Sequence, residues 1–134
     1  MKQLTKEQFD ERDKILEPYF DTTYCKDWFG GLMYLKNVPA SVIRELIDKG
    51  LADPEDCQNS APSLEEMCEF CEKHSAYTIH GYVVGRQRED TRVTAEGIES
   101  DDMSPDDLQD LLMFRHADDF NINTTEGTFY CWYD

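Results

Sequence analysis

The sequence predicts an α+β fold in which a helical N-terminal half, with about four helices, packs on a small, mainly antiparallel sheet of about three strands. Apolar residues recur near the helical period of 3.6 up to about residue 74, and they alternate with the strand period of two from residue 77 to 84. A further helix and a short aromatic strand follow, so that a helix precedes the last strand.

The length of 134 residues favours a single domain, 1–134. We divide it into a helical part, residues 1–74, and a part with a hairpin, an acidic helix and a terminal strand, residues 75–134. Seven Phe, seven Tyr and two Trp argue against a disordered acidic chain, which would have few aromatic residues.

The first two helices are expected near residues 5–20 and 25–35. Thr5 to Gln8 fits a capping box, in which the threonine caps the helix and the glutamine side chain reaches back to it. The second helix would run from Cys25 to Leu35. The Gly30-Gly31 pair lowers its helix propensity and indicates either a bend or close packing.

The third and fourth helices have clearer boundaries. Pro39 suits the first turn of a helix, and Gly50 suits the position just after its end. Residues 52–62 have the composition of a loop. Ser63 to Glu66 is a second capping box, which predicts a fourth helix.

The second half begins with a hairpin and ends with a strand. Tyr77–Val84 alternates at the strand period, and Thr91–Ile98 is expected to be the returning strand. Ser104 is a good N-cap and Pro105 suits the first helical position, so a helix is expected to begin there. The aromatic strand Thr128–Tyr133 is expected to complete the sheet, because an isolated hairpin is only marginally stable.

The net charge of −16 is the strongest functional clue. Such a charge repels nucleic acids and anionic membrane surfaces, so we expect neither as a direct partner. The first residues lack the apolar segment of a secretory signal, and five Cys is an odd number. We therefore expect free thiols and a cytoplasmic location.

More than half of this charge lies near the C-terminus, where residues 99–134 have a net charge of −9. A solvated, solubilising face is the simplest interpretation. A second interpretation is calcium binding, although the spacing of the acids does not fit an EF-hand loop. The third is a docking surface for a basic protein partner, such as a nucleic-acid-binding enzyme that this chain inhibits or regulates by imitating phosphates. Its residues would be Glu99, Asp101, Asp102, Asp106, Asp107, Asp110, Asp118, Asp119, Tyr130 and Trp132. We expect a monomer or homodimer.

A zinc-binding module is one alternative function. Cys68, Cys71 and His74 are spaced as metal ligands could be. However, both cysteines lie on the apolar face of the fourth helix, where buried cysteines act as small hydrophobic residues. We therefore expect a core role and no cofactor. No known catalytic motif occurs, so we do not expect an enzyme.

A winged-helix regulatory domain is the other alternative. Arg86, Arg88 and Arg92 lie around the expected hairpin turn, where a basic wing would contact DNA. Against this, the helix at 40–49 carries Glu45 and Asp48 beside its two bases, whereas a recognition helix needs a basic surround.

Overall fold

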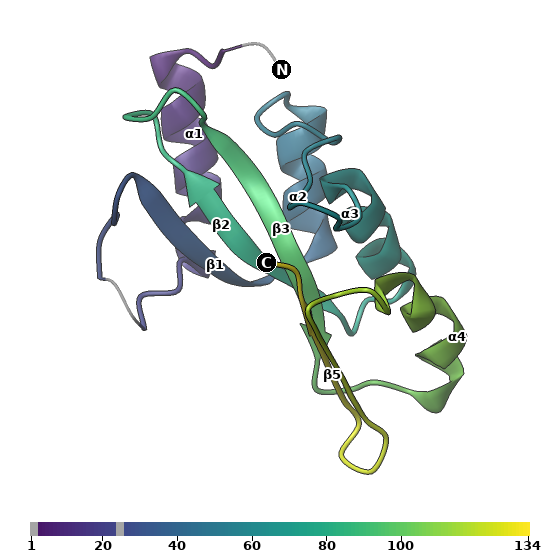
Figure 1. Cartoon of the computed structure of the whole chain (residues 1–134). Helices are drawn as coiled ribbons and strands as arrows, with labels where there is room; N and C mark the ends of the chain where they lie inside the picture. Colours follow the sequence, from purple (N-terminus) through teal and green to yellow (C-terminus); the bar gives the residue numbers. More distant parts are fainter. Residues whose placement is uncertain (1–2, 24–25) are drawn as a thin grey trace.

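The computed structural model of the chain describes residues 3–23 and 26–134 (Figure 1). In chain order the elements are α1 (Lys6–Leu16), β1 (Leu32–Val38), α2 (Ala40–Asp48), α3 (Leu64–Lys73), β2 (Thr78–Val84), β3 (Arg92–Ser100), α4 (Leu108–Leu111), β4 (Asp119–Asn123) and β5 (Thr128–Trp132). Short 3-10 turns follow α1 at Glu17–Tyr19 and flank α4 at Pro105–Asp107 and Leu112–Phe114. The expected α+β class is confirmed.

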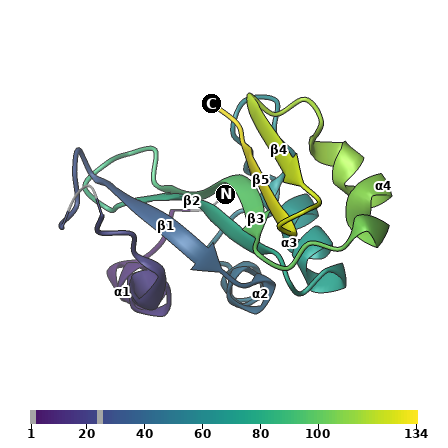
Figure 2. The same ribbon diagram turned by 90° about the horizontal axis from the view of Figure 1, so that it is seen from below.

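The five strands form one antiparallel sheet in the order β1-β2-β3-β5-β4. Figure 2 shows α1, α2 and α3 on the same side of this sheet. No described helix lies on the opposite side, which we call the open face. Side chains of a strand point alternately to the two faces, so every second residue of β1, β2 and β3 points away from the helices.

The hydrophobic core fills the space between the helices and the sheet. Each of its large side chains contributes about 1.5–3 kcal/mol when it is fully buried. Its fully buried members come from the helices, from β1, β2, β3 and β5, and from the segment around α4, and they include Leu16, Val38, Leu46, Met67, Val83, Ile98, Leu111, Phe114 and Cys131.

Three predicted helix starts are confirmed. The Thr5 and Ser63 hydroxyls accept hydrogen bonds from the amides of Gln8 and Glu66, and both capping boxes are complete. Ser104 caps the 3-10 turn that leads into α4. These signals are local, since each side chain satisfies a backbone group three residues away or closer.

The expected helix from Cys25 to Leu35 is wrong. Phe29 and Leu32 exchange two backbone hydrogen bonds of 2.9 and 3.0 Å, and both residues between them, Gly30 and Gly31, have positive φ. Two glycines with positive φ form the tight hairpin turn that suits a twisted sheet. The chain then enters β1. Cys25 itself lies outside the described residues.

The expected number of about three strands is also wrong, as is that of about four N-terminal helices. Of the described residues before 75, three segments are α-helical, and a turn with the start of β1 takes the place of the second expected helix. β4 was not expected, because its alternation of Asp119, Phe120, Asn121, Ile122 and Asn123 includes only two apolar residues. It pairs with β5 along its whole length, so β5 is an inner strand.

Candidate functional site

A groove with a volume of about 530 Å³ lies on the open face. We call it the open-face groove. Its side chains come from four strands and from the segment before β1: Asp21, Phe29, Tyr34, Leu35, Lys36, His80, Glu96, Glu99, Tyr130 and Trp132, with Gly81. One end of the open face is covered by the loop before α3, where Gln58 accepts a hydrogen bond of 2.8 Å from the Tyr82 hydroxyl. The groove is the part that this loop leaves exposed.

A β-bulge explains why two glutamates three residues apart both line the groove. In the β2–β3 register, Gly81 pairs with Ala95 and His80 pairs with Gly97, so Glu96 is an extra residue in β3. Residues i and i+3 of a regular strand point to opposite faces, and one inserted residue restores the same face. Glu96 and Glu99 therefore both face the groove.

His80 connects three strands beneath the groove. Its ring stacks on Tyr130 with 5.0 Å between centroids and 5° between planes. Its Nε2 lies 2.8 Å from the Cys131 carbonyl oxygen, which only accepts, so Nε2 carries the proton. The ring passes Gly97, where a Cβ would lie 2.9 Å from His80 Nε2. Burial lowers the pKa of His80, which favours the neutral imidazole.

Two of the carboxylates that line the groove, those of Glu96 and Glu99, have raised pKa values. Burial raises the pKa of Glu96, although the Trp132 indole donates a hydrogen bond of 3.1 Å to it. Burial also raises the pKa of Glu99, with Lys36 opposing this effect and Asp101 and Asp21 adding to it. Within the described part of the chain, neither glutamate forms an ion pair.

The structure brings some of the predicted docking residues to this groove. Glu99, Tyr130 and Trp132 line it directly. Asp101 lies in the bend after β3, and Asp119 pairs opposite Trp132 on β4. Together with Asp21 these two aspartates form what we call the acidic rim: Asp21, Asp101 and Asp119. Asp102 is exposed beside Asp101, and Asp118 accepts a hydrogen bond of 2.9 Å from the Asp134 amide.

The other predicted docking residues lie away from the groove, on the segment around α4. Asp107 accepts hydrogen bonds from the Tyr77 hydroxyl at 2.8 Å and from the Ser104 amide at 3.1 Å. Asp110 lies 3.1 Å from Lys73 Nζ and 2.9 Å from His74 Nε2. These two carboxylates hold the α4 segment against α3, and neighbouring Asp106 is exposed.

The expected core role of the Cys68 and Cys71 side chains is confirmed. Both are buried, and the Cys68 thiol donates to the Ala40 carbonyl at 3.4 Å. Burial raises the pKa of Cys68 to about 11 and that of Cys71 to about 12, which favours the protonated thiols. His74 instead faces Asp107 and Asp110. In residues 3–23 and 26–134, no group of three or more His, Cys, Asp or Glu is placed to hold a metal ion.

The bases proposed for a DNA-binding role are engaged within the chain. A cation that is already paired has less charge to offer a phosphate. Each of them forms an ion pair with a carboxylate of this chain: Arg86 with Asp10, Arg88 and Arg92 with Asp90, Arg44 with Glu65 and Glu72, and Lys49 with Glu45.

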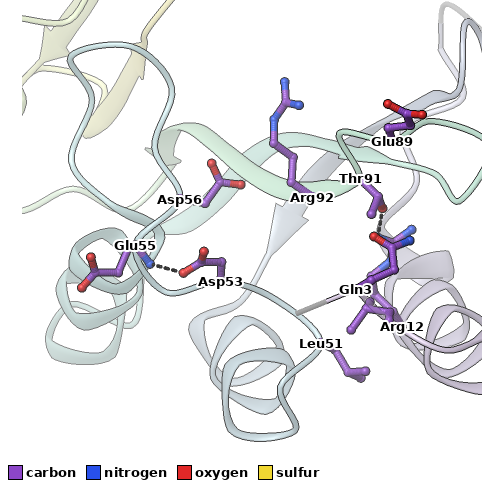
Figure 3. Close-up of a pocket in the computed structure, with 10 residues that line it drawn as sticks. Gln3, Arg12, Leu51, Asp53, Glu55, Asp56, Glu89, Thr91 and Arg92 are labelled. Carbon is purple, nitrogen blue, oxygen red and sulfur yellow. Dashed lines mark hydrogen bonds between the residues drawn. The ribbon is translucent and has the colours of Figure 1, made fainter. Parts of the chain in front are cut away.

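A second, smaller recess of about 280 Å³ lies between α1, the segment after α2 and the start of β3 (Figure 3). Arg12 is 1% exposed there, and its Nη1 donates to the Thr91 hydroxyl at 2.9 Å. Its Nη2 lies 2.9 Å from Asp13 Oδ1 but makes no hydrogen bond of good geometry. Arg12 thereby fastens α1 to the sheet. The remaining lining has mixed charge: Asp53, Glu55, Asp56, Glu89 and Arg92.

Several residues that line the groove were not predicted from the sequence. Tyr34 lies within the expected helix over residues 25–35, and Lys36 follows directly after it, so neither was expected on a strand. Glu96 was missed because the bulge was not recognised, although a glycine inside a strand, here Gly97, is the usual signal of one. The alternation over Tyr77–Val84 places His80 on the same strand face as Thr78 and Tyr82, but nothing in the sequence indicates its contact with β5.

No family model, curated protein or solved structure matches this chain. No helix in the described ranges is long and apolar enough to cross a membrane.

Proposed function

We propose that this chain is a non-catalytic binding protein that docks on a basic protein partner through the open-face groove and its acidic rim. One observation carries the proposal: the groove combines exposed aromatic rings with two half-buried carboxylates that have no ion-pair partner in the described residues. Aromatic side chains supply the anchoring area of protein interfaces, and carboxylates steer and orient a cationic partner.

We centre the proposed site on the sheet, because the groove lies there. The sequence placed it on the whole acidic C-terminal segment, where carboxylates on a helix would imitate phosphates. Asp107 and Asp110 have contacts inside the protein, and exposed Asp106 lies on the same segment away from the groove, so none of the three belongs to the contact surface that we propose. We therefore propose an inhibitor or regulator whose contact surface is the sheet, with long-range attraction supplied by the net charge of −16.

Affinity capture with matched variants tests this function. The double variant E96Q/E99Q removes the two groove charges, and E7Q/D106N removes two exposed charges elsewhere, so both have the same net charge. We expect the wild-type chain and E7Q/D106N to retain the same basic protein from a lysate of the source cells at about 0.15 M salt. E96Q/E99Q should lose it. Capture of no basic protein, or equal capture by all three chains, would contradict the proposal.

A further inference from the structure

We infer that the open-face groove receives an arginine side chain of the partner, with its guanidinium beside Glu96 and Glu99 and against the aromatic rings. This inference rests on the proposed function and adds the chemical group that the groove recognises. It follows from the unpaired charge, the exposed rings, and the cation that the chain itself places at the groove.

The Glu96 and Glu99 carboxylates accept fewer hydrogen bonds than their oxygens allow. A half-buried carboxylate is costly unless a cation or several hydrogen bonds compensate it. The Trp132 indole satisfies one Glu96 oxygen, and within the described residues no side chain or amide donates to the Glu99 carboxylate. A guest with several N–H donors and a positive charge would supply what both groups lack.

The rings provide surfaces on which a planar cation can stack. Phe29 is 71% exposed and Tyr34 is 43% exposed, both at the groove. Tyr130 and Trp132 are partly exposed on β5, and Tyr130 is held in place by the stacked His80 ring. Cations bind over the faces of such rings, and a guanidinium also stacks on them.

The combination favours arginine over lysine. The guanidinium is flat, has five N–H donors and is weakly hydrated, so it contacts a ring and a carboxylate at the same time. A lysine ammonium is a compact and strongly hydrated charge, which is harder to bring into a half-buried groove. The volume of about 530 Å³ leaves room for the residues on either side of the arginine.

Lys36 is the resident cation of the groove. Among the described lining residues it is the one positively charged side chain, because His80 is held neutral by burial. The positive charge of Lys36 opposes the rise in the pKa of Glu99 that burial causes, so Lys36 partly compensates the charge that the partner's arginine would compensate. Removing Lys36 should therefore strengthen binding of a cation, whereas removing a residue with a purely structural role would weaken it or have no effect.

The two tryptophans allow a direct test on the full chain. Trp132 donates its indole N–H to Glu96, while Trp28 packs edge-on against Phe20 and does not line the groove. The ¹⁵N-labelled chain is titrated with three capped tripeptides that have Arg, Lys or uncharged citrulline between two glycines. We expect a saturable shift of the Trp132 indole signal with the arginine peptide, and a Kd at least about fivefold weaker with lysine. Citrulline should give no saturable shift.

Variants of the groove residues show whether the arginine peptide binds at the groove. E96Q and E99Q should each weaken the affinity for the arginine peptide about tenfold, and K36A should strengthen this affinity about twofold. E7Q/D106N should leave the affinity unchanged. Equal affinity for the arginine and lysine peptides, or unchanged affinity in E96Q and E99Q, would overturn the inference. If a basic protein is still captured through Glu96 and Glu99 in that case, the proposed function stands and only the arginine assignment fails.

Discussion

Gly97 is the residue that lets β3, β5 and the His80 ring meet at one point. A Cβ there would lie 1.9 Å from the Cys131 carbonyl oxygen, which is backbone and cannot rotate away. We expect Gly97→Ala to lower the free energy of unfolding by about 2–3 kcal/mol, because the two strands must separate. Urea denaturation measures this loss.

Gly50→Ala is the matched control for this prediction. Unlike Gly97, Gly50 has a positive φ, of 70°, and a Cβ there would meet no atom within 4 Å. Its cost is therefore backbone strain alone, about 1 kcal/mol. Equal losses in the two variants would show that crowding at Gly97 is not important.

The ionised Glu99 side chain lowers the stability of the folded protein. Its pKa is raised in the folded protein, so the folded state holds the proton more tightly than the unfolded state does. Ionisation therefore costs stability as the pH rises through the ordinary glutamate value toward 7. We expect Glu99→Gln to raise the free energy of unfolding by about 0.5–1 kcal/mol at pH 7.

The pH dependence of this gain is the decisive part of the prediction. At pH 3 the wild-type carboxyl is protonated in both states, so the advantage of glutamine should vanish. Thermal unfolding of both chains at the two pH values measures it. A destabilised Glu99→Gln variant at pH 7 would mean that the ionised carboxylate is compensated within the chain.

At the scale of elements, the α4 segment depends on Asp107 for its attachment to the rest of the chain. Tyr77 is 1% exposed, and its hydroxyl donates to Asp107, which also accepts from the Ser104 amide. Asp107→Ala would leave a buried hydroxyl and an amide unpaired. We expect a loss of about 2 kcal/mol in chemical denaturation.

Asp106→Ala provides the comparison, because Asp106 is the exposed neighbour in the same 3-10 turn. We expect a change of less than about 0.5 kcal/mol. In the background of Tyr77→Phe, the loss from Asp107→Ala should shrink, since the shared hydrogen bond is already gone. An undiminished loss in that background would contradict the role given to the Tyr77 contact.

The elements that the sequence predicts correctly are those with local signals. The capping boxes at Thr5 and Ser63 involve residues three apart, so they can be recognised without the tertiary structure. The segment before β1 is different, because its apolar spacing fits a helix as well as a strand and only the turn geometry of Gly30-Gly31 decides. β4 was missed because an edge strand paired on one side can be mostly polar.

At the scale of the whole molecule, the net charge predicts a class of partner but does not indicate where that partner would bind. Glu99, Tyr130 and Trp132 were predicted from the charge and aromatic content of the C-terminal segment, and the structure places them together in one groove. Glu96 and Tyr34 join them only through the bulge and through the pairing of β1 with β2. Such contacts join residues far apart in the chain, which a single sequence does not reveal.

The raised pKa values of Glu96 and Glu99 predict that binding of the proposed partner depends on pH. These two glutamates should lose their negative charge at a higher pH than exposed carboxylates do, whereas Asp21, whose pKa is lowered by its hydrogen bond with Thr23, keeps its charge. We expect the affinity for a basic partner to fall between pH 7 and pH 5 in the wild-type chain and in E7Q/D106N. Calorimetric titration across this range should show a much flatter profile for E96Q/E99Q, and parallel profiles would contradict the assignment.

The most direct test of the account compares the affinity of the captured partner for three chains at one ionic strength. Relative to the wild-type chain, E96Q/E99Q should bind at least about fiftyfold more weakly, whereas E7Q/D106N should lose less than about threefold. That difference would place the contact at the open-face groove. Equal losses in the two double variants would contradict the account, because they would show that the partner responds to total charge and not to the groove.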